Sequence, residues 1–236
     1  MAHQFILQAI ATILVTLLFL SSPTTAGSPV LDIDGNPLEV GSQYYVLTAG
    51  RGAAGRGGLT DTFKPPSVCP SYVAQHGSWT NNGRPVTFYP SDSSQKQIIQ
   101  GDEMNIAFGI IPLCRSTGIW RLTFDNETHV PYVATNGVIG NPGTFETFGN
   151  WFKIEKAFGD SSYKIVFCFV EPVPAPGNTN LVGRRRHCEQ LDATQKGPNG
   201  DLSYLSLVPL DQNLPFFGYV FKKVDTSSAT TTTAFY

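Results

Sequence analysis

Two neighbouring motifs near the start of the chain decide its fold. The first reads Val30-Leu31-Asp32-Ile33-Asp34-Gly35-Asn36-Pro37-Leu38, and the second, which follows after five residues, reads Tyr44-Tyr45-Val46. The central Asp-Gly-Asn-Pro run favours a tight turn, since Gly accepts a positive φ, Asn and Asp bond to nearby backbone, and Pro fixes φ. The run at 43–47 is rich in β-prone residues and predicts a strand. Together the motifs indicate a turn followed by a strand.

Short β-prone runs separated by turn signals continue through the rest of the chain. Many of them alternate apolar and polar side chains, which is typical of a half-buried strand. We expect further strands at 85–89, 104–108, 119–124, 151–156, 163–168, 204–208 and 219–224. No long segment with the period of a helix follows the N-terminal segment. The sequence therefore predicts an all-β fold, and closure into a barrel is the usual way to remove exposed sheet edges.

The composition favours one globular domain. The chain has 236 residues, of which 41% are hydrophobic and 14% charged, and its formal net charge is −2. All-β domains of this length are common as single units. The small net charge gives no reason to expect a nucleic acid or an anionic membrane as a partner.

The N-terminal segment resembles a cleavable secretion signal. An apolar run from Ala9 to Leu20 precedes the small residues Thr24-Thr25-Ala26, which are typical of a signal-peptidase site. The run is short for a membrane span, but no Lys or Arg precedes it, so a buried helix or an anchor is the alternative. We expect a signal peptide at 1–26, one domain at 27–224 and a disordered Ser/Thr/Ala-rich tail at 225–236. After cleavage, the protein would have no membrane contact and would reside in the apoplast or the vacuole.

Secretion makes disulfides the expected state of the four cysteines. Four cysteines allow three pairings, of which the neighbour pairing Cys69–Cys114 and Cys168–Cys188 is the simplest. In the chain-entropy view, these two loops would contribute about 4 and about 3 kcal/mol. A metal site is the alternative, but the sequence holds no CxxC and no close Cys/His set other than His187-Cys188, so we expect no metal.

Three further segments carry surface signals. Asn126-Glu127-Thr128 is the only Asn-x-Ser/Thr triplet and suits a glycosylated turn, although such triplets also arise by chance. The Pro-rich run at 172–178 would be a tethered surface loop if Cys168 pairs with Cys188. The basic run Gly183-Arg184-Arg185-Arg186-His187 predicts a solvated loop face, with proteolytic processing or a second protease-facing loop as alternatives.

Motifs that would indicate an enzyme or a cofactor are missing or out of context. There is no Gly-x-Ser-x-Gly, and His76, His129 and His187 lie in polar, turn-like contexts that predict solvated loop side chains. Gly50-Arg51-Gly52-Ala53-Ala54-Gly55 fits a dinucleotide-binding fingerprint. The glycines and prolines that follow exclude the helix which that fingerprint must open. We expect neither catalytic residues nor a cofactor.

With later landmarks, the two N-terminal motifs resemble the plant Kunitz-type, soybean-trypsin-inhibitor-like family of proteinase inhibitors. The landmarks are Cys69-Pro70, Pro85-Val86-Thr87-Phe88, Asn105-Ile106-Ala107-Phe108, Cys114 with Trp120, Trp151-Phe152-Lys153-Ile154, Tyr163-Lys164-Ile165-Val166-Phe167-Cys168 and Val220-Phe221-Lys222-Lys223-Val224. The resemblance covers about residues 29–224.

This resemblance implies a β-trefoil of twelve strands, six in a short barrel and six in a hairpin cap, with the neighbour disulfide pairing. It also implies a monomeric plant defence protein that blocks a serine endopeptidase through a substrate-like exposed loop. The flanking motifs place this reactive loop at Ser91, Asp92, Ser93, Ser94, Gln95, Lys96 and Gln97.

The loop departs from the trypsin-directed members of the family, which carry Arg or Lys before the scissile bond. Counting from the left flank puts that residue near Asp92, and counting from the right flank puts it near Ser94. Lys96 is the only cation of the loop, so it is the best single anchor for a trypsin-like pocket. The alternative is that Lys96 only solubilises the loop.

Two other functions stay open. Some relatives inhibit cysteine proteases or other hydrolases through different loops, and the missing Arg or Lys keeps this alternative open. The chain's C-terminal end, from Phe221 to Tyr236, looks like that of water-soluble chlorophyll proteins of the same superfamily. A small-molecule-binding (chlorophyll-like) or storage protein is therefore the other alternative.

Overall fold

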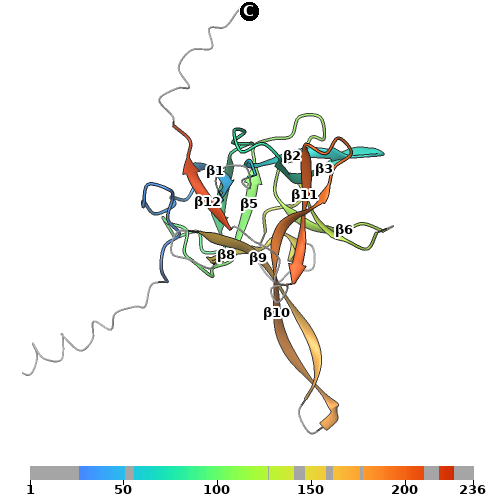
Figure 1. Ribbon diagram of the computed structural model, residues 1–236. Helices are drawn as coiled ribbons and strands as arrows, with labels where there is room; N and C mark the ends of the chain where they lie inside the picture. Colours follow the sequence, from blue (N-terminus) through green and yellow to red (C-terminus); the bar gives the residue numbers. More distant parts are fainter. Residues whose placement is uncertain are drawn as a thin grey trace, which may run out of the picture.

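The structure is a computed structural model of the chain (Figure 1). It describes residues 27–50, 56–126, 128–140, 147–157, 162–175, 178–209 and 218–225, without the side chains of 171–175, 178–185 and 209. The expected signal peptide at 1–26 and the expected tail, except Asp225, lie outside these residues. Among the helices of the described part, none is long and apolar enough to cross a membrane.

The described residues form twelve strands and one short 3-10 turn, η2, at Phe148–Asn150. The strands are β1 Gln43–Thr48, β2 Leu59–Lys64, β3 Ser67–His76, β4 Val86–Pro90, β5 Met104–Phe108, β6 Arg121–Phe124, β7 Pro131–Ala134, β8 Phe152–Lys156, β9 Tyr163–Ala175, β10 Asn178–Lys196, β11 Leu202–Pro209 and β12 Tyr219–Lys223. Each run that the sequence marks as β-prone contains or overlaps one of these strands. The all-β prediction is confirmed.

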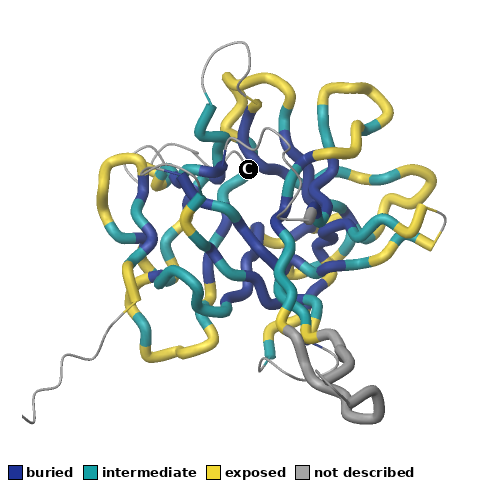
Figure 2. The backbone as a smooth tube through the Cα atoms, turned by 60° about the horizontal axis from the view of Figure 1, so that its bottom comes forward, coloured by how far each residue is buried: buried dark blue, intermediate teal, exposed yellow. Residues whose placement is uncertain are grey.

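Six of the strands pair in a closed antiparallel ring, in the order β12, β1, β4, β5, β8, β9 and back to β12. Along β1, β8 and β12, buried residues alternate with more exposed ones, as a strand with one face on a core requires. Figure 2 shows the buried chain at the centre and the exposed loops around it. The ring encloses a core rich in aromatic side chains, which include Tyr44, Phe88, Phe152, Tyr163, Phe167, Tyr219 and Phe221.

The other six strands form a cap of three antiparallel hairpins, β2–β3, β6–β7 and β10–β11. One strand of each hairpin meets the other two, because β3, β7 and β11 pair with one another. The same arrangement therefore recurs every four strands, which is the threefold plan of a β-trefoil, and the predicted fold is confirmed.

A triangle of tyrosines marks the centre of this cap. Tyr72, Tyr132 and Tyr204, one from each hairpin, stand edge to face with ring centroids 6.0 to 6.1 Å apart. Each tyrosine lies opposite a small residue of the next hairpin in the ladder, which leaves room for the ring. The opposed pairs are Tyr72 with Ala134, Tyr132 with Ser206 and Tyr204 with Ala74. We call the three rings the tyrosine triad.

The β9–β10 hairpin corrects two expectations for surface loops. The Pro-rich run at 172–178 lies mostly in strands, since β9 ends at Ala175 and β10 begins at Asn178. The Arg184–Arg186 run, expected in a solvated loop, is paired within β10. Figure 1 shows this hairpin projecting from the body of the molecule. Both strands of such a ribbon are edge strands, where prolines cost no hydrogen bond if their nitrogens face outward.

Two disulfides join the pairs that the sequence analysis expected. Cys69 of β3 is bonded to Cys114, which follows β5, and Cys168 is bonded to Cys188. The second bridge connects residues that already face each other across the β9–β10 ladder.

Candidate functional site

The segment Ser91–Gln97 is an exposed connection between two strands of the ring. It leaves the end of β4 at Pro90 and returns to buried Ile98 before β5 begins. Gln95 is half-buried, and the other six side chains of the segment are exposed. The ring therefore presents this loop to solvent from a fixed base, which suits a binding loop on a rigid scaffold.

Backbone hydrogen bonds hold both ends of the loop. At the start, the Ser91 amide donates to the Glu103 carbonyl at 2.9 Å. At the end, the Lys96 carbonyl accepts from the Val40 amide at 3.0 Å, and Gln97 forms a bridge with Glu39. The loop is thus pinned to Glu103, directly before β5, on one side and to the N-terminal segment on the other.

The N-terminal motif supplies that second support because its own turn is rigid. The Asp32 carboxylate accepts from the amides of Asp34 at 3.0 Å and Asn36 at 2.8 Å, and Gly35 has a φ of 83°. The turn that the sequence predicts here is confirmed. The chain then runs beside the loop, where the Ile98 amide donates to the Leu38 carbonyl at 2.9 Å.

Inside the loop, Asp92 closes a turn. Its Oδ1 accepts from the Ser94 amide at 2.9 Å and from Ser94 Oγ at 2.7 Å, and the Gln95 amide donates to the Asp92 carbonyl at 3.2 Å. The Ser94 hydroxyl, and secondly the Ser94 amide, hold the pKa of the Asp92 carboxyl below its usual range. The apex of the loop therefore lies at 93–94.

Gln95 ties the loop to its base. Its Nε2 donates to Asp102 Oδ2 at 2.7 Å, while its Oε1 is buried without a protein partner. Glu103, the next residue along, pairs with Arg186 at 3.0 Å and with Lys153 at 3.6 Å. Arg186 comes from β10, so the base of the projecting hairpin borders the strand that supports the loop.

The predicted loop residues are thus brought together, but Ser94 and Lys96, two positions that the sequence offers for the anchor residue, are not equivalent. The Lys96 carbonyl is already engaged by Val40, whereas Ser94 stands at the apex. Both side chains are exposed. The flanking motifs in the sequence located the loop, but they gave no sign of the two interactions that shape it, the Asp92–Ser94 turn and the Gln95–Asp102 hydrogen bond. The only available signal was Asp92 two residues before Ser94, a spacing typical of an Asx turn.

The three histidines lie apart from this loop, and the expectation that each sits in a solvated loop is wrong for two of them. His76 ends β3 and His187 lies in β10, where its ring centroid is 5.1 Å from that of Phe169 and its Nε2 is 3.2 Å from Glu189. Burial lowers the pKa of His76. His129 is exposed in a turn with a φ of 56°. Within the described residues, no three His, Cys, Asp or Glu side chains gather in a way that would hold a metal ion.

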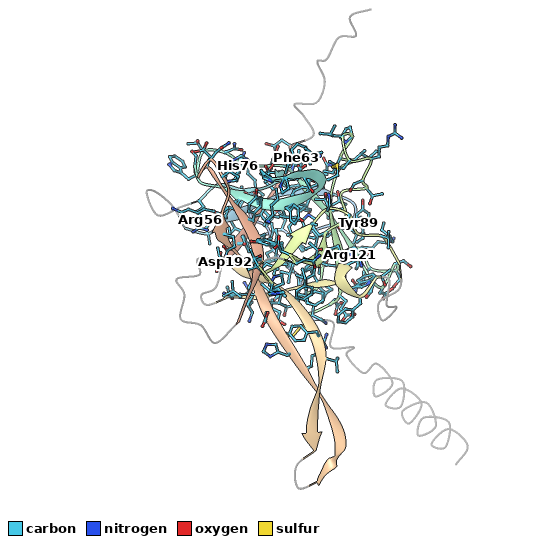
Figure 3. All side chains as sticks on the ribbon, turned by 90° about the vertical axis from the view of Figure 1, so that its right-hand side faces the viewer. Arg56, Phe63, His76, Tyr89, Arg121 and Asp192 are labelled. Carbon is cyan, nitrogen blue, oxygen red and sulfur yellow. A yellow bond between two sulfur atoms is a disulfide. The ribbon has the colours of Figure 1, made fainter. Side chains whose placement is uncertain are left out.

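A separate cavity of about 880 Å³ lies where the N-terminal turn meets the ends of β1 and β12. Its wall is mostly apolar, and Trp79 beside it is 63% exposed. Two cations also line it, Arg56 and Lys156. Figure 3 shows Arg56 close to Asp192, whose pKa is raised by burial against the opposing effects of the Ala193 amide and Arg56.

The sequence pattern of the legume Kunitz family, described as trypsin and protease inhibitor, matches residues 30–195. The chain belongs to the plant Kunitz-type inhibitor family. The matched range contains the N-terminal motif, the whole loop and all four cysteines of this Kunitz-type chain.

Named relatives agree with this assignment. The Kunitz-type chain is 40% identical to Kunitz trypsin inhibitor 5 of Arabidopsis thaliana over 144 residues, which cover 61% of the chain and 67% of the relative. It is 42% identical to the 21 kDa seed protein of Theobroma cacao over 153 residues, or 64% of the chain and 68% of that protein. Alocasin, a protease inhibitor from giant taro (Arum macrorrhizon), has a crystal structure that superposes with a TM-score of 0.61 at 27% identity, covering 84% of this chain and 99% of alocasin.

Proposed function

We propose that the secreted protein inhibits a serine endopeptidase by placing the Ser91–Gln97 loop in the protease's active-site cleft as a substrate would lie. The observation that carries this proposal is an exposed loop pinned at both ends, through Ser91 to Glu103 and through Lys96 to Val40. Folding has already ordered this backbone, so little conformational entropy remains to be lost on binding. An exposed backbone of this kind pairs with the edge of a protease cleft.

Ser94 is the better candidate for the residue before the scissile bond. A protease must form hydrogen bonds with the backbone on both sides of that residue. The Lys96 carbonyl, however, already accepts a hydrogen bond from the Val40 amide. Ser94 stands at the exposed apex, at the position that counting from the right flank gives. A serine fills a deep acidic pocket poorly, so this register favours a protease with a small or shallow pocket over trypsin.

The test is a panel of serine and cysteine proteases titrated with the mature protein and three variants. Ser94→Arg should strengthen trypsin inhibition about thirtyfold, the equivalent of about 2 kcal/mol for a buried central anchor. Ser94→Gln is the matched control, since it adds length without charge and should produce no gain against trypsin. Lys96→Ala should leave inhibition unchanged.

Two results would redirect the proposal. A loss of trypsin inhibition in Lys96→Ala would return the anchor to Lys96. If no loop variant changes any inhibition that the wild type shows, the loop is not the reactive site.

In this proposal the protein acts as a monomer and performs no catalysis of its own. The histidines give the most direct check, because hydrolysis by a serine or cysteine nucleophile needs a neighbouring base. Hydrolase activity that persists through purification and disappears in a His76, His129 or His187 variant would overturn this part.

The projecting β9–β10 hairpin favours a second candidate, inhibition of a cysteine protease or another hydrolase through a different loop. The hairpin extends beyond the ring and the cap (Figure 1), and its base carries Arg186. Replacing Arg184, Arg185 and Arg186 by Gln should then weaken inhibition, while Ser94→Gln leaves it intact.

The apolar cavity beside Trp79 favours a third candidate, a small-molecule carrier or storage protein. The volume of about 880 Å³ is within the range of ligand sites. A coloured protein as purified from its source would support this candidate. A colourless protein that inhibits a protease stoichiometrically would exclude it.

A further inference from the structure

The β6–β7 hairpin has one face packed on the cap and one face that runs out into solvent. On the packed face, Tyr132 is 4% exposed within the tyrosine triad, and Asp125 pairs with Lys64 at 2.7 Å. The other face begins in the main core with Leu122 opposite Val133. Two residues further along, the same face leaves the core.

Phe124 is the first residue of that face beyond the core. It lies opposite Pro131, and 66% of Phe124 is exposed. The Phe124 ring, at the end of a short hairpin, therefore leaves apolar surface in water, and burial of that surface would be favourable. A covering group would recover that burial, and the neighbouring sequence indicates which group it is.

The hairpin turn places the glycosylation triplet directly after Phe124. Asp125 begins the turn, since its carboxylate accepts from the Thr128 amide at 2.8 Å and from Thr128 Oγ1 at 2.9 Å, while its carbonyl accepts from the His129 amide at 2.8 Å. Asn126 is exposed in this turn and lies only two residues after Phe124, so a sugar attached to its side chain begins within reach of the Phe124 ring. Glu127, the middle residue of the triplet, lies outside the described residues.

We propose that Asn126 carries an N-linked glycan and that the first N-acetylglucosamine of this glycan packs on the exposed ring of Phe124. One face of a pyranose ring presents mainly C–H groups, and the face of an aromatic ring carries the negative lobe of its quadrupole, so the two attract each other. Pro131 extends the apolar platform from the opposite strand. The sugar therefore covers Phe124 and stiffens the hairpin that carries Tyr132 into the triad.

The modification needs the donor of the secretory pathway, a polyprenyl-diphosphate oligosaccharide, so it depends on the chain being secreted. Transfer forms the bond between Asn126 Nδ2 and C1 of the sugar and breaks the bond from C1 to the diphosphate oxygen. The diphosphate leaves with the bonding electron pair, and Nδ2 loses one proton to a base. The covering of Phe124 then follows from position alone and needs no further reaction.

The decisive experiment compares the protein from a secreting eukaryotic host with and without the sugar. Mass spectrometry of the peptide containing Asn126 establishes occupancy, and trimming leaves a single N-acetylglucosamine. Thermal unfolding of this form and of Asn126→Gln gives the shift due to the sugar. In the wild-type background we expect the sugar to raise the melting temperature by about 2 to 4 °C.

The same comparison in Phe124→Thr tests the platform, and we expect the shift to fall below about 1 °C there. Ile110→Thr is the matched control, because Ile110 is also exposed, at 73%, but lies outside the β6–β7 hairpin, and the full shift should remain. A nuclear Overhauser contact between the sugar and the Phe124 ring provides a reading that is independent of stability. An unmodified Asn126, an equal shift with and without Phe124, or the absence of that contact would each overturn the proposal.

Discussion

The tyrosine triad and the Ser91–Gln97 loop belong to the same molecule but are held in place by opposite means. Tyr132 and Tyr204 are 4% and 5% exposed, and their rings contact each other and Tyr72. Apart from half-buried Gln95 the loop side chains are exposed, and the shape of the loop depends on a few hydrogen bonds between exposed or half-buried groups. Apolar packing sets how stable the protein is, whereas the bonds of the loop set only which conformation it presents.

This difference explains how one scaffold can present different loops. Substitutions at the loop apex remove no buried area, so they should leave stability almost unchanged while they alter what the loop binds. Substitutions in the triad should do the reverse, because all three hairpins of the cap meet there.

Tyr132→Ala should cost about 4 kcal/mol of stability, because it removes a buried ring together with its contacts to two aromatic neighbours and leaves a cavity. Urea denaturation measures the change. Ser93→Ala in the loop is the control and should cost less than about 0.5 kcal/mol. Similar losses in the two variants would contradict the separation between packing and loop.

The two disulfides should contribute unequally to stability. The sequence separation is 45 residues for Cys69–Cys114 and 20 for Cys168–Cys188. Replacing both cysteines of a pair by Ser should therefore cost about 4 kcal/mol for the first bridge and about 3 kcal/mol for the second. Denaturation of the two double variants measures these losses. A larger loss at Cys168–Cys188, or a mapped peptide that links Cys69 to Cys168, would refute this expectation.

Sequence alone predicted a strand at every position of the ring, but in the cap it predicted only β6 and β11. The ring strands carry clear β-prone runs, whereas Pro65-Pro66 and Cys69-Pro70 act as apparent strand breakers and conceal β2 and β3. The threefold plan is present in the sequence as Tyr72-Val73-Ala74, Tyr132-Val133-Ala134 and Tyr204-Leu205-Ser206. Three residues are too few to stand out as a repeat until the ladder places each Tyr opposite the small residue of the next hairpin.

The position of the loop could be predicted, but its conformation could not. The flanking strands fix where the loop begins and ends. Its internal shape depends on which side chains bond to which backbone groups, and many such pairings are compatible with a polar run of seven residues. The contact between Gln95 and Asp102 also depends on the return of the chain into β5, which no local pattern encodes.

Gln95→Ala should make the loop more mobile with little effect on the stability of the fold. The substitution removes the hydrogen bond from Gln95 Nε2 to Asp102 Oδ2, so the free loop should sample more conformations. Reordering it on binding would cost about 1 kcal/mol, which corresponds to an inhibition constant about fivefold weaker. Inhibition kinetics and urea denaturation measure the two effects. A loss of stability larger than the loss of affinity would show that Gln95 belongs to the scaffold.

The smallest expected effect is a change in the loop apex at low pH. The bonds from Ser94 lower the pKa of Asp92 in the folded protein, so their contribution is fully present above the unfolded value of about 3.9. It is lost as the pH falls through the lower, folded value. The Ser94 amide resonance should therefore stay constant from neutral pH down to about 4 and change only below it.

Asp92→Asn separates charge from shape in this titration. The amide oxygen of Asn can still accept from Ser94 but does not titrate, so the Ser94 resonance should show no inflection in this variant. Asp92→Ala removes the acceptor, so the Ser94 amide of this variant should resemble that of wild type at low pH throughout. A wild-type midpoint at or above about 3.9 would mean that the turn does not favour the carboxylate. The apex would then be ordered by its two anchored ends alone, and the contrast with the triad would be sharper still.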